Sequence, residues 1–240
     1  MAYTFTLTAG EDEVRPISVD YDIEEIRNRY LKLSTPFASD VLFAMGLPSQ
    51  AMDTGIYPLK DDMKVAGPAF TSSRYRGTIA KSIDKKHIDL IPSLTPGCVF
   101  ISDDGGDRAC AHMGDILCML YQSRGCTGAV LDWAARDTGT IAEMGFPMFC
   151  RGKNPTAGHE RSVVIDYNVP IFVHGVDGML RVNPGDFIFG DSDGVVIIPK
   201  DKTVEVLEKM EAMAAIEVEM RAAVNGGMDA VEAFRKFRRS

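Results

Sequence analysis

Alternating apolar and polar positions divide the first two thirds of the chain into short helices and strands. The acidic, amphipathic stretch 21–33 predicts a helix. Thr35-Pro36 predicts the start of a second helix, with Thr35 as N-cap and Pro36 at the first helical position, ending near Gly46. Further helices are predicted over 79–90, 114–125 and 138–144, and strands over 64–72 (with a break at Gly67-Pro68), 98–102, 129–131 and 147–150.

The last third of the chain differs in composition and in the elements it predicts. Residues 163–199 are rich in Val, Ile and Phe and are interrupted by turn signals, including Asp177-Gly178 and Pro184-Gly185. Residues 201–224 predict one long helix that ends at Gly226-Gly227, and 228–237 predict a short one. We therefore expect an α/β fold with a β-rich core, helices outside it and a helical C-terminal arm.

Composition narrows the class of protein. The chain has 240 residues, 45% of them hydrophobic and 25% charged, which is typical of one globular domain with appended helices. The net charge of −8, with no basic run beyond the short tail 235–239, disfavours nucleic acid and acidic membranes as partners. Small anionic substrates remain compatible, because local charge at a site can oppose the global sign.

The cysteines and the start of the chain indicate a cytoplasmic protein. The five cysteines form no CxxC pair, so we interpret them as reduced core residues and expect no zinc site made from them. The first residues lack the charged and apolar regions of a signal peptide, and no apolar run approaches the length of a membrane span.

Two short segments carry candidate chemistry. Gly114-Asp115 opens a predicted helix, whose first backbone N–H groups can hold an anion that the glycine lets approach closely. Arg136-Asp137 follows a predicted buried strand, in a strand-to-helix connection where functional side chains often lie. By spacing alone, a structural ion pair is the more common explanation of Arg136-Asp137, and a Gly-Asp pair at a helix start is common.

Together these residue types suit a 2-oxo acid. The helix start can hold the carboxylate, and a hard divalent metal on Asp137 can chelate the carboxylate and the keto oxygen. Arg136 can stabilise the enolate oxygen that forms when a C–C bond breaks, and Asp115 can position a water.

Other polar residues are better explained by structure. The four histidines show no ligand spacing, although His112 lies close enough to Gly114 to edge the site. A solvated loop is the preferred interpretation of 103–107, with a metal cluster as the alternative, and a hairpin turn is preferred over a calcium loop for 191–194. Trp133, the single tryptophan, is expected to pack rather than to contact substrate.

An ordered set of motifs resembles the RraA-like family. The run GDILCMLYQSRGCTGAVLDWAARDTGTIAEMGFPMFCRG and the later run PGDFIFGDSDGVVIIP carry the resemblance, which extends over about residues 35–227. That family includes 4-hydroxy-4-methyl-2-oxoglutarate / 4-carboxy-4-hydroxy-2-oxoadipate aldolases and the regulator of ribonuclease E activity. The resemblance implies an αββα sandwich similar to the swivelling phosphohistidine domain. It divides the chain into an N-terminal extension (1–34), a catalytic domain (35–200) and a C-terminal helical arm (201–240).

The resemblance also implies roles for the candidate residues. Asp137 matches the metal ligand and Arg136 the arginine that binds the pyruvyl oxygen. Asp115 matches an acid that holds metal-bound waters. Gly114, Asp115, Ile116 and Leu117 match the segment whose amides bind the pyruvate carboxylate. Asp40 and Glu217 occupy positions similar to acids that a neighbouring subunit contributes in trimers or hexamers of the family.

We therefore predict a Mg²⁺- or Mn²⁺-dependent class II pyruvate aldolase, with oxaloacetate decarboxylation as a related activity. A non-catalytic regulatory ring that binds a ribonuclease is one alternative, and a lyase or dehydratase acting on a sugar-derived 2-oxo acid is another. A methyltransferase is disfavoured because no glycine-rich nucleotide loop follows a first strand. The segment 132–137 departs from the family pattern at Trp133, which leaves the natural substrate open.

Overall fold

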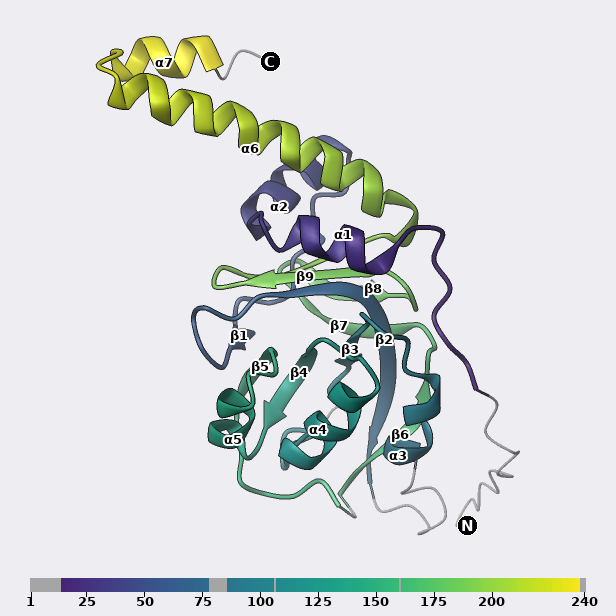
Figure 1. Cartoon of the computed structure of the whole chain (residues 1–240). Coiled ribbons are helices and arrows are strands. Elements are labelled where there is room, and N and C mark those ends of the chain that lie inside the picture. The colour runs from purple at the N-terminus through teal and green to yellow at the C-terminus, as the bar shows by residue number, and fades with distance from the viewer. Residues whose placement is uncertain (1–13, 78–85, 106, 160, 238–240) are drawn as a thin grey trace.

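Four parallel strands form the centre of the fold. The computed structural model describes residues 14–77, 86–105, 107–159 and 161–237 (Figure 1). Strand β2 (Val65–Arg76) pairs in parallel with β3 (Val99–Ser102), β3 with β4 (Ala129–Ala135), and β4 with β5 (Met148–Lys153). The residues of β3 are all buried, as expected for a parallel strand covered on both faces.

Antiparallel strands complete the sheet on both sides of this centre. Strand β1 (Tyr57–Pro58) pairs with β5, β9 (Phe187–Asp191) pairs with the first half of β2, and β10 (Gly194–Ile198) pairs with β9. Strand β6 (Ser162–Tyr167) pairs with the second half of β2, and β7 (Ile171–Gly175) forms a separate hairpin with β8 (Gly178–Val182). The result is a mixed α/β fold whose curved sheet nearly closes into a barrel.

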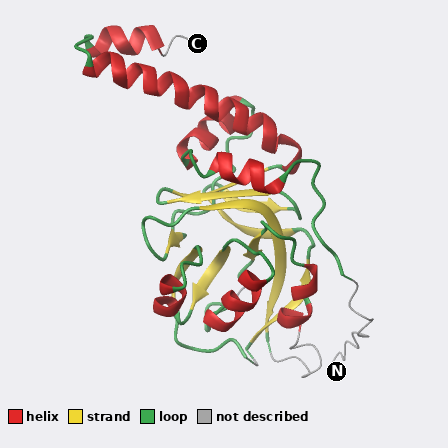
Figure 2. Cartoon of the chain, viewed as in Figure 1, coloured by secondary structure: helices red, strands yellow, loops and turns green. Residues whose placement is uncertain are grey.

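Helices cover the sheet on its two outer sides (Figure 2). Helices α4 (Asp115–Ser123) and α5 (Thr138–Glu143) lie on one side, near the short α3 (Lys86–Asp89). On the other side lie α1 (Ile23–Tyr30), α2 (Thr35–Ala44) and the first part of α6 (Thr203–Asn225), which continues as an arm to α7 (Ala230–Phe237). No helix in the described ranges is long and apolar enough to cross a bilayer.

Three hydrophobic clusters define the order of the layers. The first joins α4 and α5 to the parallel strands through residues such as Tyr121, Ile141 and Phe100. The second lies between the parallel strands and β7 to β10, and the third joins β9 and β10 to α1, α2 and α6. Burying apolar faces in this sequence places helices outside and strands inside. The expected likeness to the swivelling phosphohistidine domain stays a prediction.

Most predicted elements are confirmed, and the differences have local causes. The break expected at Gly67-Pro68 is wrong, because β2 continues through it. The dipeptide instead marks the point where β2 changes partner, since Pro68 is paired with β9 and Ala69 with β3. Of the helix expected over 79–90, residues 86–89 are helical, and 79–85 lie outside the described residues.

Thr35 is not the N-cap of α2. Ser34 occupies that position, and Thr35 is the first helical residue. The backbone N–H and the hydroxyl of Thr35 donate to the carboxylate of Asp191, at 2.8 Å and 2.7 Å. Asp191 begins the β9–β10 turn, which confirms the hairpin expected over 191–194. This tertiary contact replaces the local cap.

Candidate functional site

The carboxyl ends of β3 and β4 place the two candidate segments side by side. The chain that follows β3 returns along the end of β4, where the N–H of His112 donates to the carbonyl of Ala134 and the N–H of Arg136 donates to that of Met113, both at 2.9 Å. Gly114 follows immediately as the N-cap of α4. In open α/β sheets, this edge is where ligands commonly bind.

Gly114 is needed for space rather than for its backbone angles. Its φ of −131° and ψ of −177° are open to any residue. A Cβ at this position would lie 2.6 Å from Oδ2 of Asp137 and 3.1 Å from Nε of Arg136. The missing side chain therefore leaves a small recess bounded by the backbone at the start of α4, Arg136 and Asp137.

Asp137 has a strained backbone and an accessible side chain. Its φ of 53° and ψ of 30° lie in the left-handed region, which non-glycine residues seldom adopt and which clusters at functional sites. Oδ2 of Asp137 lies 3.3 Å from Nε of Arg136, and the two side chains are 40% and 43% exposed. The pair is thus open to a ligand, unlike a buried structural ion pair.

A cavity of about 260 Å³ opens beside this recess. The predicted residues Gly114, Asp115, Ile116, Leu117 and Arg136 all line it, whereas Asp137 is placed next to it through its contacts with Gly114 and Arg136. Ile116 is exposed, so its side chain is free to meet a ligand. Asp115 is the single carboxylate among the described lining residues.

Asp40 and Glu217 lie elsewhere in the chain. Asp40 is exposed on α2, and Glu217 lies on α6, where Arg221 donates to it at 3.2 Å. Both helices cover the side of the sheet away from α4 (Figure 1). Neither residue lines the cavity of its own chain, so any part they take at a site requires a second copy.

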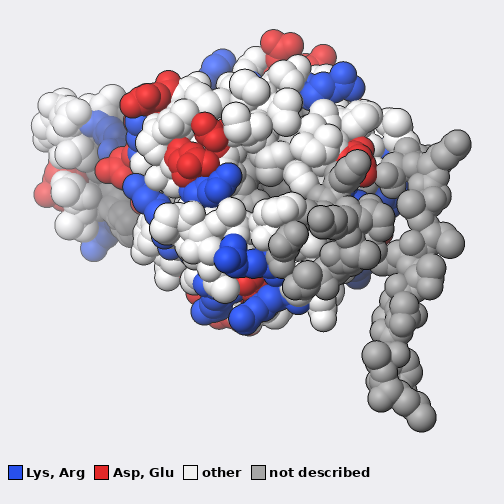
Figure 3. Space-filling model, turned by 90° about the horizontal axis from the view of Figure 1, so that it is seen from below, with Lys and Arg blue, Asp and Glu red and all other residues white. Residues whose placement is uncertain are grey.

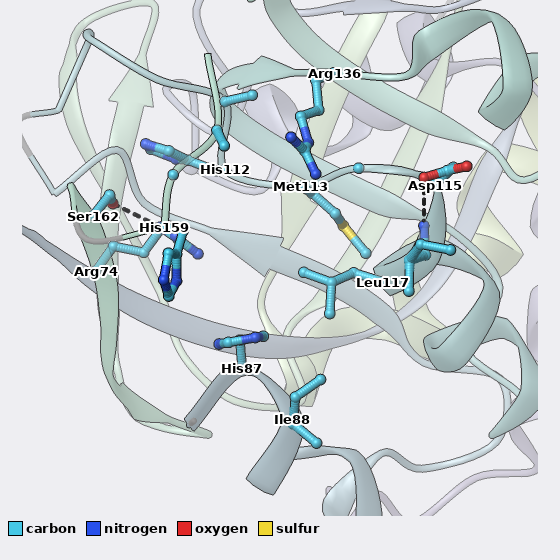
Figure 4. A pocket seen from close by; sticks show the side chains of 15 residues that line it. Arg74, His87, Ile88, His112, Met113, Asp115, Leu117, Arg136, His159 and Ser162 are labelled. Carbon is cyan, nitrogen blue, oxygen red and sulfur yellow. Dashed lines mark hydrogen bonds between the residues drawn. The ribbon is translucent and has the colours of Figure 1, made fainter. Parts of the chain in front are cut away.

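Four polar cavity residues were missed by the sequence analysis. They come from β2, α3, the loop before β6 and β6 itself, and they gather around one side of the cavity (Figure 4). No local pattern marked them, since Arg74 lies in the polar second half of β2, residues 71–76. His112, which was expected to edge the site, does line the cavity. The missed residues are Arg74, His87, His159 and Ser162.

His112 belongs to a buried cluster with Asp107 and Cys110. The thiol of Cys110 donates to Oδ2 of Asp107 at 2.7 Å, and burial raises the pKa of that thiol to about 12. Nε2 of His112 lies 3.6 Å from the same carboxylate oxygen, and neither ring nitrogen has a hydrogen-bond partner among the described residues. Asp107 is fully buried, so the solvated loop expected over 103–107 is wrong at this residue.

A second polar cluster surrounds Asp132 inside the sheet. Arg151 donates to Oδ1 of Asp132 through Nε and a terminal nitrogen at 3.0 Å and 2.8 Å. The backbone N–H of His174 donates to Oδ2 at 2.8 Å, and Nδ1 of its ring lies 2.7 Å from the same oxygen. These contacts satisfy both oxygens of Asp132, so we interpret this cluster as structural.

Trp133 packs against the loop instead of lining the cavity. The Arg108 guanidinium carbon lies 5.2 Å from the centre of the Trp133 ring, in a cation–π contact. Its indole nitrogen is buried and has no hydrogen-bond partner in the described part of the chain. Through Arg108, Trp133 contacts the loop that carries Asp107, Cys110 and His112.

We expect His112 to lower the stability of the metal-free protein as the pH falls from 7 to 5, whereas Asp103, whose pKa is raised to about 6 by burial, opposes this change. Burial, together with the charge of Arg74, lowers the pKa of His112 to about 3, although Asp107 opposes this shift. The folded ring therefore stays neutral while the unfolded one takes up a proton below its ordinary pKa of about 6.5. Through this ring the unfolded state binds more protons in this range, so His112 lowers the unfolding free energy by at most about 1.4 kcal/mol per pH unit.

Urea unfolding at pH 5, 6 and 7 measures this slope. His112→Gln has no titrating ring, so on going from pH 7 to pH 5 its unfolding free energy should fall less, or rise more, than that of the original chain. Equal slopes in the two proteins would contradict the assignment of a neutral, buried ring to His112.

The residues near Gly114 fit a hard divalent cation. Asp137 and Asp115 offer carboxylate oxygens, which suit Mg²⁺ or Mn²⁺ better than softer metals. The recess that a Cβ on Gly114 would fill lies directly against Oδ2 of Asp137. Within the described residues, the groups of three potential ligands are Asp107, Cys110 and His112, and Asp104, Asp132 and His174. Neither group includes Asp137, so one chain supplies few ligands to a cation there.

Two curated proteins are similar in sequence to this chain. Protein DlpA of Legionella pneumophila is 31% identical over 192 residues, which cover 79% of this chain but 30% of DlpA. A Halalkalibacterium halodurans protein, named "Putative 4-hydroxy-4-methyl-2-oxoglutarate aldolase", is 32% identical over 179 residues, covering 75% of this chain and 80% of that protein.

Solved structures show the same fold. An uncharacterised protein from Pseudomonas syringae superposes with a TM-score of 0.77 at 25% identity, covering 96% of this chain and 100% of the other. Streptomyces coelicolor RraAS2, described as an unusual member of the RNase ES inhibitor RraA family, superposes with a TM-score of 0.73 at 24% identity, covering 85% and 99%. The profile described as "RraA-like: Aldolase/RraA" matches residues 35–197. The chain belongs to the RraA-like family.

Proposed function

We propose that this protein is a divalent-metal-dependent pyruvate aldolase. It would cleave a 4-hydroxy-2-oxo acid to pyruvate and a second oxo acid. The observation that carries the proposal is the convergence of the α4 N-terminus, Arg136 and Asp137 on the recess at Gly114. The aldolase name of the Halalkalibacterium relative supports the same reaction class.

The start of α4 would bind the carboxylate of the 2-oxo acid. The first backbone N–H groups of a helix have no partner within the helix and carry partial positive charge. Ile116 and Leu117 belong to this first turn and line the cavity, and no side chain at Gly114 obstructs the approach. The N–H of Ile116 donates to Oδ1 of Asp115 at 2.8 Å, and the substrate carboxylate would take the place of this contact. Held there, the substrate presents its 2-oxo group toward Arg136.

Arg136 would stabilise the charge that develops during cleavage. As the C3–C4 bond breaks, the proton leaves the 4-hydroxyl, C4 becomes a carbonyl, and the electron pair passes to C3 and onto the 2-oxo oxygen as an enolate. The Arg136 guanidinium is already charged and faces the cavity (Figure 4), so it can donate hydrogen bonds to that oxygen. Protonation of C3 then yields pyruvate.

Asp115 would receive the hydroxyl proton, directly or through one water. It is the carboxylate that the described residues place in the cavity lining, and it stands at the helix start next to the proposed carboxylate site. A base must reach the proton it removes, and the place of Asp115 in the cavity lining supports this role.

Asp137, with Asp115 nearby, would hold Mg²⁺ or Mn²⁺. When bound, such a cation supplies a Lewis acid that polarises the 2-oxo group. The same enolate also forms when oxaloacetate loses carbon dioxide, so oxaloacetate decarboxylation is part of the proposal. Asp40 and Glu217 of a second copy would add acids in a trimer or hexamer, and the cytoplasm is the proposed location.

A panel of 2-oxo acids tests this function. We expect 4-hydroxy-4-methyl-2-oxoglutarate and oxaloacetate to release pyruvate with added Mg²⁺ or Mn²⁺, measured with a coupled dehydrogenase. Chelation with EDTA should abolish release, and readdition of either cation should restore it. Pyruvate release that persists at full rate in EDTA would refute metal dependence. Absence of release with every substrate, together with capture of a ribonuclease, would favour the regulatory ring instead.

A further inference from the structure

Three side chains that can bind a transition metal meet in the loop between β3 and α4. Asp107, Cys110 and His112 are all buried, and one ligand atom from each lies within 4.8 Å of the other two. Oδ2 of Asp107 lies 2.7 Å from Sγ of Cys110 and 3.6 Å from Nε2 of His112. A carboxylate, a thiol and an imidazole from one short segment therefore converge on the same point.

His112 is the unsatisfied member of this cluster. Its side chain is fully buried, and neither ring nitrogen has a hydrogen-bond partner among the described residues. Burying a polar group in this way is unfavourable, because its hydrogen bonds to water are lost and nothing replaces them. A cation bound to Nε2 would supply the missing partner.

The other two ligands are already oriented toward the same point. The backbone N–H of Ala109 donates to Oδ1 of Asp107 at 2.9 Å, and Nε of Arg76 lies 3.9 Å from the same oxygen. These contacts hold one carboxylate oxygen and leave Oδ2 to the cluster, as outer contacts commonly do for metal ligands. The thiol of Cys110 donates to Oδ2, so a cation would displace the thiol proton, which passes to solvent.

The donor types and their spacing fit zinc. Zn²⁺ binds Cys sulfur, His nitrogen and Asp oxygen, and bond lengths of about 2.0 to 2.3 Å place the ligand atoms of a tetrahedral site roughly 3.3 to 3.7 Å apart. The 3.6 Å between His112 and Asp107 matches this spacing, whereas the hydrogen-bonded 2.7 Å between Cys110 and Asp107 must widen by about 1 Å. A thiolate and a carboxylate together balance the charge of the cation, which is needed because Arg74 and Arg76 add positive charge nearby.

We propose that Asp107, Cys110 and His112 form a Zn²⁺ site that holds the loop leading to Gly114. The spacing of the cysteines argues against a zinc site built from several of them, and this cluster instead combines a single cysteine with His and Asp. Three protein ligands leave the fourth position to a water. His112 also lines the cavity, which gives the cation a path from solvent (Figure 4). On the face seen from below, acidic side chains are intermixed with basic ones, so an approaching cation meets no uniformly basic surface there (Figure 3).

The cation would add stability to a loop that already has backbone contacts. The N–H of Ala111 donates to the carbonyl of Thr156, and that of His112 donates to the carbonyl of Ala134, both at 2.9 Å. The loop therefore keeps its path without metal, and zinc would hold it more tightly. This site is separate from the Mg²⁺ or Mn²⁺ site proposed at Asp137, whose donors are oxygens, and it does not depend on the aldolase reaction.

Cobalt substitution tests the site. Co²⁺ bound to a thiolate gives an intense charge-transfer band in the near ultraviolet, which Co²⁺ bound to oxygen ligands alone does not give. We expect titration of the metal-free chain to produce this band with a stoichiometry of about one, and Zn²⁺ to remove it. Cys110→Ala should abolish the band. Cys118→Ala removes another buried thiol, in α4, and should retain it, as should Asp137→Asn.

Thermal unfolding gives an independent measure. Zn²⁺ at about 100 times its Kd should raise the Tm of the metal-free chain by about 5 to 10 °C, and that of Cys110→Ala by less than about 2 °C. His112→Gln keeps the thiol but loses the imidazole, so it should bind Co²⁺ at least about tenfold more weakly than the original chain.

The original chain and two variants decide the outcome. Absence of the charge-transfer band in the original chain would overturn the zinc site, and so would a band that survives unchanged in Cys110→Ala. If Cys110→Ala does not fold, His112→Gln replaces it, and an unchanged Co²⁺ affinity in that variant would overturn the site. None of these measurements involves pyruvate release, so the zinc site and the proposed function stand or fail separately.

Discussion

Arg136→Met is expected to lower kcat for pyruvate release by about 10²- to 10³-fold, the usual effect of removing one donor from a developing oxyanion. The side chain lines the cavity, and its Nε lies 3.3 Å from Oδ2 of Asp137, with both groups accessible. Methionine keeps most of the volume but removes the charge and the hydrogen-bond donors. The coupled pyruvate assay at saturating Mg²⁺ measures the effect.

Arg124→Met provides the matched control. Arg124 is an exposed arginine at the end of α4, outside the cavity, and its loss changes the net charge by the same amount. We expect wild-type kcat from this variant and an unchanged circular dichroism spectrum from both. If Arg136→Met turned over at the wild-type rate, Arg136 would have no role in stabilising the enolate.

Gly114→Ala is expected to lower activity by roughly 10²-fold and to weaken Mg²⁺ binding, because one methyl group enters the recess that the proposed site requires. The new Cβ would lie 2.6 Å from Oδ2 of Asp137, so the carboxylate must move. Displacements of this size at a reacting centre commonly cost about two orders of magnitude in rate. Steady-state kinetics and Mg²⁺ titration calorimetry measure the two effects.

Gly139→Ala is the control for the same chemical change. A Cβ at Gly139, in α5, meets no atom within 4 Å. Alanine is also the better helix former, by about 0.5 to 1 kcal/mol, so this variant should be active and at least as stable. Equal activity of the Gly114 and Gly139 variants would show that the recess at Gly114 has no function.

Local patterns predicted much of the fold because they depend on near neighbours in the sequence. The apolar runs of β3 and β5, the turn between β9 and β10, and the glycine at the start of α4 are each recognisable from a few residues. The adjacency of Arg136 and Asp137 likewise needed no tertiary information. Thr35 shows the limit of such local prediction. Its hydroxyl donates a hydrogen bond to Asp191, which lies 156 positions away, instead of capping its own helix.

The sequence by itself determined the α/β class, the order of the elements and the pairing of Gly114 with Arg136 and Asp137 as candidates, since these follow from periodicity and from motifs. Only the tertiary structure decided which other residues share the cavity. Arg74, His159 and Ser162 reach it because β2 changes partner from β9 to β3 and β6, and pairing between distant strands depends on packing that no local pattern records. The same packing buried Asp107 and His112 and left Arg136 and Asp137 open to a ligand.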